Sequence, residues 1–283
     1  MEHAAAATTT TTAGNTTAPI YHQVADDGVC GFTPASVGLM LASALLFTVV
    51  YNASSFVFFR LSATYRHLPA KLQLRWDNRV ASTLHALIIV PGCLHAFFFA
   101  YDTQNLTPHT AILGCNSEAM VWACVSAGYF TWDSLTYLLY VAARRTDDVE
   151  VGEFVHAFSP FVQYYAMFFL AYELSTPFVN FHWFMDKYLV PNSNPIKLLN
   201  GILLVVCFFL ARIAFGFYYS YAIVRDLYIV AADNIAAHGP WSLNVSAVTI
   251  SLIILTMCVL NSHWFFLIIS FVQKKPRTTK KKE

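Results

Sequence analysis

Polar residues at helical spacing stand inside the apolar stretches of this chain, and they are the first candidates for chemistry. Asn78, Ser82 and His85 sit at positions i, i+4 and i+7, so a helix places them on one face. Inside a bilayer such a group is costly unless it meets a partner or a wet cavity. What this face contacts in a membrane is therefore the main functional question.

Three further polar stripes repeat this pattern along the chain. They begin at Ser126, His156 and Glu173, and each continues at a spacing of three or four residues. Arg212 adds a lone cation inside a later apolar run. The polar residues that we assign to one inward-facing surface are Asn78, Arg79, Ser82, His85, Asp133, His156, Gln163, Glu173, Asn180, Trp183 and Arg212.

Two interpretations of these residues stay open. Ser, Thr and Asn side chains commonly join membrane helices by hydrogen bonds worth about 0.6 kcal/mol each. A charge in mid-membrane costs several kcal/mol, so Asp133, Glu173 and Arg212 need partners or a role. Arg212 could pair with either acid, or all three could line a cavity. His85 and His156 could exchange protons near neutral pH or serve as hydrogen-bonded structural residues.

The composition predicts an all-α, multi-pass membrane protein. Of 283 residues, 57% are hydrophobic and only 12% are charged, against about 25% charged in soluble domains. Several apolar runs reach about 20 residues, the length that crosses a hydrocarbon core of about 30 Å. The alternating strands of about 10 residues that a membrane barrel requires are not apparent.

Residues 1–34 are rich in Ala and Thr and contain no Lys or Arg, so we expect a disordered tail and not a cleavable signal peptide. Residues 35–69 would hold the first span and a basic loop, 70–272 the main domain, and 273–283 a basic tail. The expected spans are 35–59, 79–100, 118–142, 197–222 and 245–272, with a long apolar tract over 154–185.

The tract 154–185 decides the number of crossings. As one helix it would be about 48 Å long, too long for one span and short for two. The basic loops after the first and third spans, and the basic tail, predict a cytoplasmic C-terminus and a lumenal or exterior N-terminus. That topology needs an odd number of crossings, which favours seven spans over six.

The predicted lumenal side carries Asn15 and Asn105, each of which opens an Asn-x-Ser/Thr triplet and is a glycosylation candidate. Cys30 and Cys115 lie on the same side and could form a disulfide, which the sequence alone does not test. No Cys or His cluster predicts a metal site, and we expect no cofactor and no nucleic-acid partner.

Four segments in this order resemble the TLC-domain family over residues 70–272, and most of all its fourth TLC domain-containing protein subfamily. They are Trp76–Ala86, Ser126–Asp133, Glu173-Leu-Ser-Thr-Pro-Phe-Val-Asn180 with Trp183, and Asn200-Gly-Ile onward to Arg212. The resemblance implies an endoplasmic reticulum membrane protein whose last six helices surround a lipid-sized cavity. One N-terminal span would precede this six-helix barrel.

The resemblance also bears on catalysis. Ceramide synthases of this family use a pair of adjacent histidines for acyl transfer, and the matching place here reads His156-Ala157. An acyltransferase with His156 as general base, oriented by Asp133, therefore lacks its second histidine. The favoured hypothesis is a protein that binds or handles acyl lipids and contributes to lipid homeostasis. The alternatives are that acyltransferase and a cargo receptor or translocon-associated factor.

The C-terminal tail carries a candidate sorting signal. Lys280 and Lys281 occupy the positions of a dilysine signal for retrieval to the endoplasmic reticulum. The alternative is a basic tail that contacts anionic lipids. The expected partner in the membrane is an acyl lipid of unknown identity.

Overall fold

The computed structural model describes residues 33–144 and 162–273, and within them every regular element is a helix. The α-helices are α2 (Pro34–Leu61), α3 (Ala63–His67), α4 (Ala70–His95), α5 (Pro108–Leu113), α6 (Ser117–Arg144), α7 (Gln163–Leu170), α8 (Thr176–Lys187), α9 (Pro195–Phe208), α10 (Phe215–Ala236) and α11 (Trp241–Gln273). The π-helical segment η1 (Ala96–Ala100) extends α4. The π-helical segment η3 (Phe209–Ala214) joins α9 to α10, and the 3-10 segment η2 (Ala171–Ser175) joins α7 to α8.

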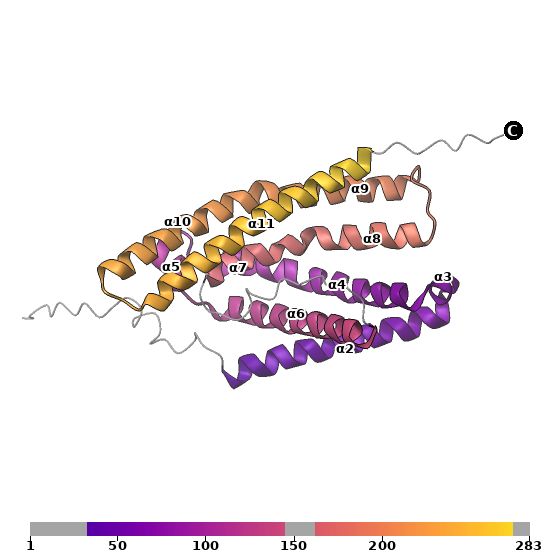
Figure 1. The fold of residues 1–283 in the computed structure, drawn as a ribbon, viewed down its shortest axis with the longest axis horizontal. Coiled ribbons are helices and arrows are strands. Elements are labelled where there is room, and N and C mark those ends of the chain that lie inside the picture. The colour runs from indigo at the N-terminus through magenta and orange to yellow at the C-terminus, as the bar shows by residue number, and fades with distance from the viewer. Residues whose placement is uncertain (1–32, 145–161, 274–283) are drawn as a thin grey trace, which may run out of the picture.

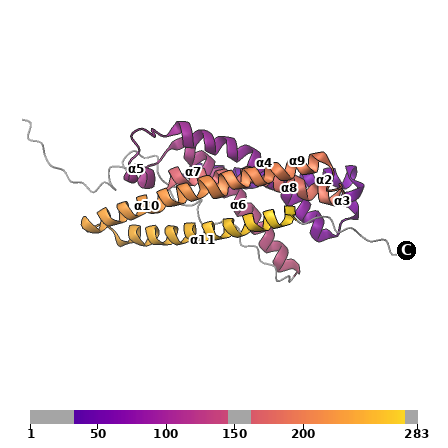
Figure 2. The ribbon, with the colours of Figure 1, turned by 90° about the horizontal axis from the view of Figure 1, so that it is seen from above.

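Most of the long helices run along the long axis of the molecule, whereas α6 crosses this direction obliquely in Figure 2 (Figures 1 and 2). One end of this bundle carries α3 and the turn from α8 to α9, and the other carries α5 and the turn from α10 to α11. Because η1, η2 and η3 continue their neighbours, the described residues form six long helical rods: α2, α4–η1, α6, α7–η2–α8, α9–η3–α10 and α11.

Four rods are long and apolar enough to cross a membrane: Pro34–Leu61, Ala70–Ala100, Pro195–Ala236 and Trp241–Ser270. The prediction of a multi-pass helical membrane protein is therefore confirmed. The helix boundaries differ from those expected, because α4 starts at Ala70, within the basic stretch expected to be a loop. At 1.5 Å per residue, the 42-residue rod 195–236 is about 63 Å long, well beyond a bilayer core.

The tract 154–185 is only partly described. Residues 163–187 form one helical rod, with Pro177 in the first turn of α8. This rod begins beside the start of α6, since the Asn116 backbone N–H donates to Gln163 Oε1 at 2.7 Å. Residues 145–161 lie outside the described part, so the seventh crossing stays a prediction.

Close packing brings α2 against α6. A Cβ atom on Gly128 would lie 2.3 Å from the Met40 carbonyl oxygen and 2.6 Å from the Ser43 Cβ. The Ser43 hydroxyl donates to the Val125 carbonyl at 2.7 Å. Small residues at such a crossing allow the two backbones to approach closely. This contact fixes α6 and, through it, the polar face that α6 turns toward α4.

Candidate functional site

The polar stripes of α4 and α6 face each other in antiparallel register. The Asn78 amide donates to Asp133 Oδ1 at 3.3 Å. One turn along, Ser82 lies beside the Tyr129 hydroxyl. These two contacts form part of a row that continues to the next turn of both helices.

The third pair of the row is the most buried. His85 Nε2 lies 3.4 Å from the Ser126 hydroxyl oxygen, and neither residue is exposed to solvent. The His85 ring stacks on Tyr129 with centroids 3.9 Å apart, while Phe47 of α2 meets it edge-on. The helical spacing read from the sequence therefore does place these side chains on facing surfaces.

Asn180 of α8 closes this polar row from a third helix. Its Oδ1 accepts from Arg79 Nη1 at 2.7 Å. Its Nδ2 lies 2.7 Å from the Ser82 hydroxyl, 2.9 Å from the Thr83 hydroxyl and 3.2 Å from the Arg79 carbonyl oxygen. Since Asn180 is buried, it links α8 to α4 by bonds that no water replaces.

Two further residues place charge at this cluster. Glu173 of η2 and Asp133 of α6 both act electrostatically on the Tyr129 hydroxyl. The Arg79 guanidinium lies 4.9 Å from the centre of the Trp183 ring, and the Lys187 amine lies 5.1 Å from it. The cluster thus combines two carboxylates and one cation with neutral donors, and Trp183 marks its edge near the α3 end of the bundle.

Two polar atoms of the cluster have no hydrogen-bond partner among the described residues. They are Asn78 Oδ1 and His85 Nδ1, at the two ends of the α4–α6 row, and both are shielded from solvent. A buried polar atom left unpaired costs about 1–3 kcal/mol. Each is therefore a place where a small polar group could be bound.

Gln163 and Arg212 make their hydrogen bonds with residues other than those of this cluster. Gln163 Oε1 accepts from the Asn116 backbone N–H and, at 3.3 Å, from the Tyr101 hydroxyl, so it fixes the start of α7 near α5. Arg212 of η3 donates to the Tyr172 carbonyl at 3.2 Å and to Asn261 Oδ1 at 3.3 Å. Among the described residues it forms no ion pair, so the first of the two interpretations left open by the sequence, a pairing with Glu173 or Asp133, is not observed.

Several predicted residues cannot be placed. His156, Asn15, Cys30, Lys280 and Lys281 lie outside the described residues. The predicted roles of these residues therefore stay predictions, including the contact between His156 and Asp133.

Two predicted lumenal residues belong to the described part. Asn105 is exposed in the loop between η1 and α5, and its amide donates to Asp102 at 2.7 Å. Cys115 is disulfide-bonded, but its expected partner is outside the described residues. Exposure of Asn105 is what a glycosylation site requires, although glycosylation itself stays a prediction.

A buried carboxylate that sequence reasoning passed over lies near the α3 end of the bundle. Asp77 accepts hydrogen bonds from the Ser54 hydroxyl at 2.6 Å and the Tyr65 hydroxyl at 2.7 Å. It is 2% exposed and joins α2, α3 and α4. An acidic residue near the start of an apolar helix could have indicated such a buried carboxylate. The residues that bond Asp77 lie on other helices, so the local sequence does not identify them.

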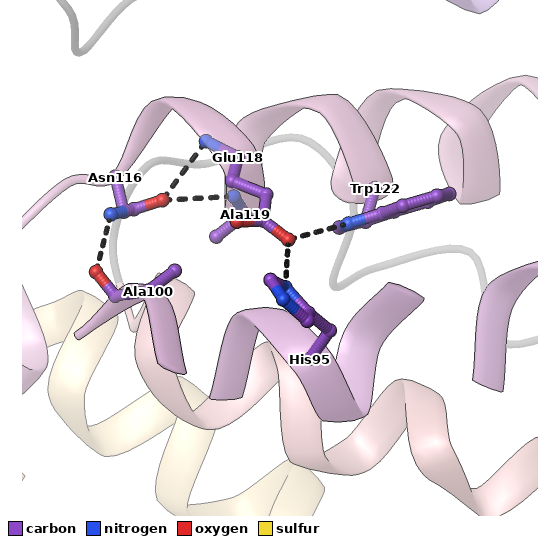
Figure 3. Close-up of polar contacts among 6 residues, drawn as sticks. All are labelled: His95, Ala100, Asn116, Glu118, Ala119 and Trp122. Carbon is purple, nitrogen blue, oxygen red and sulfur yellow. Dashed lines mark hydrogen bonds and ion pairs between the residues drawn. The ribbon is translucent and has the colours of Figure 1, made fainter. Parts of the chain in front are cut away.

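A second polar network lies at the other end of α4 and is exposed. In Figure 3 the Glu118 carboxylate lies 2.7 Å from His95 Nδ1 and also accepts from the Trp122 indole N–H at 3.5 Å. Asn116 caps the start of α6 through Glu118 N and Ala119 N. The His95–Glu118 contact joins α4 to α6, and the Asn116 cap satisfies backbone N–H groups of the first turn of α6. We interpret it as structural.

The fold and its inward polar cluster define a multi-pass helical membrane protein, and comparison with known proteins identifies its family. Residues 75–270 match the family model described as the TLC domain, which is more than half of the chain. The chain therefore belongs to the TLC domain family.

Individual relatives agree with this assignment. A TLC domain-containing protein of Schizosaccharomyces pombe is 28% identical over 258 residues, covering 88% of this chain and 82% of that protein. TLC domain-containing protein 4 of Xenopus tropicalis is 34% identical over 198 residues, covering 67% and 73%. The human TLC domain-containing protein 4 is 30% identical over 173 residues, covering 57% and 64%. No solved structure matches.

Proposed function

We propose that this chain binds an acyl lipid in the endoplasmic reticulum membrane and contributes to lipid homeostasis, with the lipid headgroup at the α4–α6–α8 cluster. The observation that carries this proposal is the pair of unsatisfied buried atoms, Asn78 Oδ1 and His85 Nδ1. Asn78 Oδ1 can only accept a hydrogen bond. A hydroxyl or amide of a lipid headgroup is a donor of the kind that it requires.

The surroundings of these atoms suit a lipid more than a soluble metabolite. Phe47, Tyr129 and Trp132 pack in one buried aromatic group beside His85. A site with a few fixed polar groups among apolar walls binds ligands that are themselves mostly apolar. The polar row would orient the headgroup, while the apolar helices would contact the acyl chain.

The first test is lipid retention. The protein and an Asn78→Leu/His85→Phe variant would be purified in mild detergent and analysed by native mass spectrometry with lipid identification. We expect the parent to retain an acyl lipid and the variant to retain at least about ten-fold less, since each lost bond to a buried group contributes about 1 kcal/mol. Equal lipid content in two folded proteins would refute the assignment of the cluster.

Asn52→Leu provides a matched control. Asn52 also lies in a membrane span, but its amide bonds only to the Thr48 carbonyl of its own helix, at 2.7 Å, and the residue is exposed. This variant should keep the lipid of the parent. If the parent itself carries no lipid, the alternative of a receptor for protein cargo becomes the better hypothesis.

The proposed location has its own test. Serine at positions 280 and 281 in place of lysine should move a tagged protein from the endoplasmic reticulum to later compartments, because a dilysine signal depends on both amines. Unchanged location by microscopy would contradict retrieval through this tail.

A further inference from the structure

The buried cation Arg212 makes none of the contacts described for the α4–α6–α8 cluster, and it lies in the middle of the longest described rod. It is 9% exposed and lies within the π-helical segment η3. A π-helical turn is rare in proteins and occurs frequently at functional sites. This placement led us to ask what balances the charge of Arg212.

Every contact that the described structure gives to Arg212 is with a neutral group. Its Nε and Nη1 donate to the Tyr172 carbonyl and to Asn261 Oδ1. The rings of Tyr172 and Phe208 lie 5.3 and 5.4 Å from the guanidinium carbon. These contacts stabilise the guanidinium, but residues 33–144 and 162–273 supply no counterion for its positive charge.

Other buried charges in the same chain are paired differently. The Lys197 amine, 5% exposed, lies 2.5 Å from Asp186. The Asp226 carboxylate, 4% exposed, lies 2.6 Å from Arg225. Arg212 is also buried, at 9% exposed, but it has no acidic neighbour within ion-pair distance in the described part of the chain. Among the described residues, Lys197 and Asp226 thus have a charged partner, whereas Arg212 has only neutral ones.

We infer that Arg212 and Asn261 form a binding site for the carboxylate of a fatty acid. A single cation matches the single negative charge of a carboxylate, and a guanidinium binds that group through parallel hydrogen bonds. Asn261 carries two donors besides the oxygen that now accepts from Arg212, so a rotated amide could bind the second carboxylate oxygen.

The walls of this site fit the rest of such a ligand. Phe208 stacks on Phe265 of α11 with centroids 6.0 Å apart, and Phe209 lies 5.6 Å from the same ring. Tyr172 is held in place because it packs against Gly216, where a Cβ would lie 2.8 Å from its hydroxyl. One charge surrounded by aromatic groups suits a charged head on an apolar chain.

The experiment uses the full chain in a neutral maltoside detergent, with oleate as the probe and oleyl alcohol as its uncharged equivalent. Thermal unfolding would be followed as each ligand is added, since a ligand that binds only the folded state raises Tm. We expect oleate to raise Tm and oleyl alcohol to have little effect. Equal shifts with the two ligands would overturn the inference.

Three variants separate binding from structure. Arg212→Gln should bind oleate at least about ten-fold more weakly, whereas Arg212→Lys should recover part of the affinity because it keeps the charge. Arg225→Gln is the control, since it removes an arginine of the same rod that already has an acidic partner. Unchanged oleate affinity in Arg212→Gln would refute a role for the cation.

Asn261→Leu keeps the inference testable if Arg212→Gln fails to fold. This variant keeps the cation but removes the amide that would donate to the second carboxylate oxygen, so oleate should still stabilise it, but less than it stabilises the parent. No stabilisation of this variant would contradict the site. Tighter binding of oleoyl lysophosphatidate than of oleate would overturn the carboxylate assignment in favour of a phosphate.

This inference is separate from the proposed function. Its test measures how added oleate changes Tm through Arg212. The test of the α4–α6–α8 cluster instead measures the lipid that the protein retains from the membrane. Either result can fail while the other holds.

Discussion

Arg79 Nη1 donates to Asn180 Oδ1 at 2.7 Å, although the two residues are 101 positions apart in the sequence. The same asparagine also bonds Ser82 and Thr83 through its Nδ2. One turn after Asn180 on α8, the Trp183 ring forms a cation–π contact with the Arg79 guanidinium. These contacts make Asn180 the link through which α8 holds the polar face of α4 in place.

Replacing Asn180 with Leu should therefore weaken the bundle at this link. The change leaves the hydroxyls of Ser82 and Thr83 and the Arg79 guanidinium without a shared partner. Bonds between membrane helices average about 0.6 kcal/mol, and a buried group left unpaired adds more. We expect a loss of about 2 kcal/mol in the free energy of unfolding, measured by denaturation in detergent.

The control for this measurement is Asn52→Leu, which removes an exposed asparagine that bonds only its own helix. It should change the free energy of unfolding by less than about 0.5 kcal/mol. If Asn180→Leu proves equally mild, Asn180 is not the link that its contacts indicate.

The sequence predicts this part of the site because helical periodicity is a local property. Asn78, Ser82 and His85 share a face whatever the rest of the chain does, and so do Ser126, Tyr129 and Asp133. That the two faces meet in register depends on the packing of α4 against α6, which no local pattern encodes. The same limit explains why Asp77 was missed, since Ser54 is 23 positions away.

The charges show this limit most clearly. Composition correctly predicts that a buried arginine needs stabilising contacts, but it does not predict which groups supply them. Arg212 bonds a backbone carbonyl and Asn261, 49 positions later, in place of an acid. Helix boundaries also differ from the predicted spans where polar residues continue a helix beyond its apolar run, as in α4 and α10.

Gly128 offers a test of the close crossing of α2 and α6. In Gly128→Val the new side chain would meet the Met40 carbonyl oxygen and the Ser43 Cβ, both of which lie well within contact distance of a Cβ at this position. Because backbone atoms cannot move aside cheaply, we expect α2 to separate from α6 and stability to fall by about 1–3 kcal/mol. Thermal unfolding in detergent measures this loss.

Gly38→Val is the matched control, because a Cβ on Gly38 meets nothing within 4 Å. Gly38 lies on α2, the other helix of this crossing, and its substitution should leave Tm close to that of the parent. A Gly128→Val protein as stable as the Gly38→Val protein would show that the crossing is not as close as described.

Asp77 should be required for the junction of α2, α3 and α4. Asp77→Leu leaves the hydroxyls of Ser54 and Tyr65 buried without their acceptor, so we expect a loss of about 2–4 kcal/mol in the free energy of unfolding. Asp77→Asn keeps one acceptor oxygen and should lose less than half as much. Equal losses in the two variants would mean that shape, and not hydrogen bonding, accounts for the role of Asp77.

Tyr65 gives the same junction a dependence on pH. Burial, together with the neighbouring Asp77 carboxylate, raises the pKa of Tyr65 from 10.0 to about 12. The folded state therefore keeps the phenol proton at pH values where the unfolded state has lost it. The stabilisation from Tyr65 is complete below pH 10 and is lost as the pH rises through the folded pKa.

Comparison with Tyr65→Phe isolates this contribution from those of the other tyrosines. The variant cannot donate to Asp77, so it should be less stable than the parent near neutral pH. The difference in Tm between the two proteins should stay constant up to about pH 10 and shrink between about pH 10 and 12. A difference that stays constant across that interval would show that the Tyr65 hydroxyl does not hold its proton through the bond to Asp77.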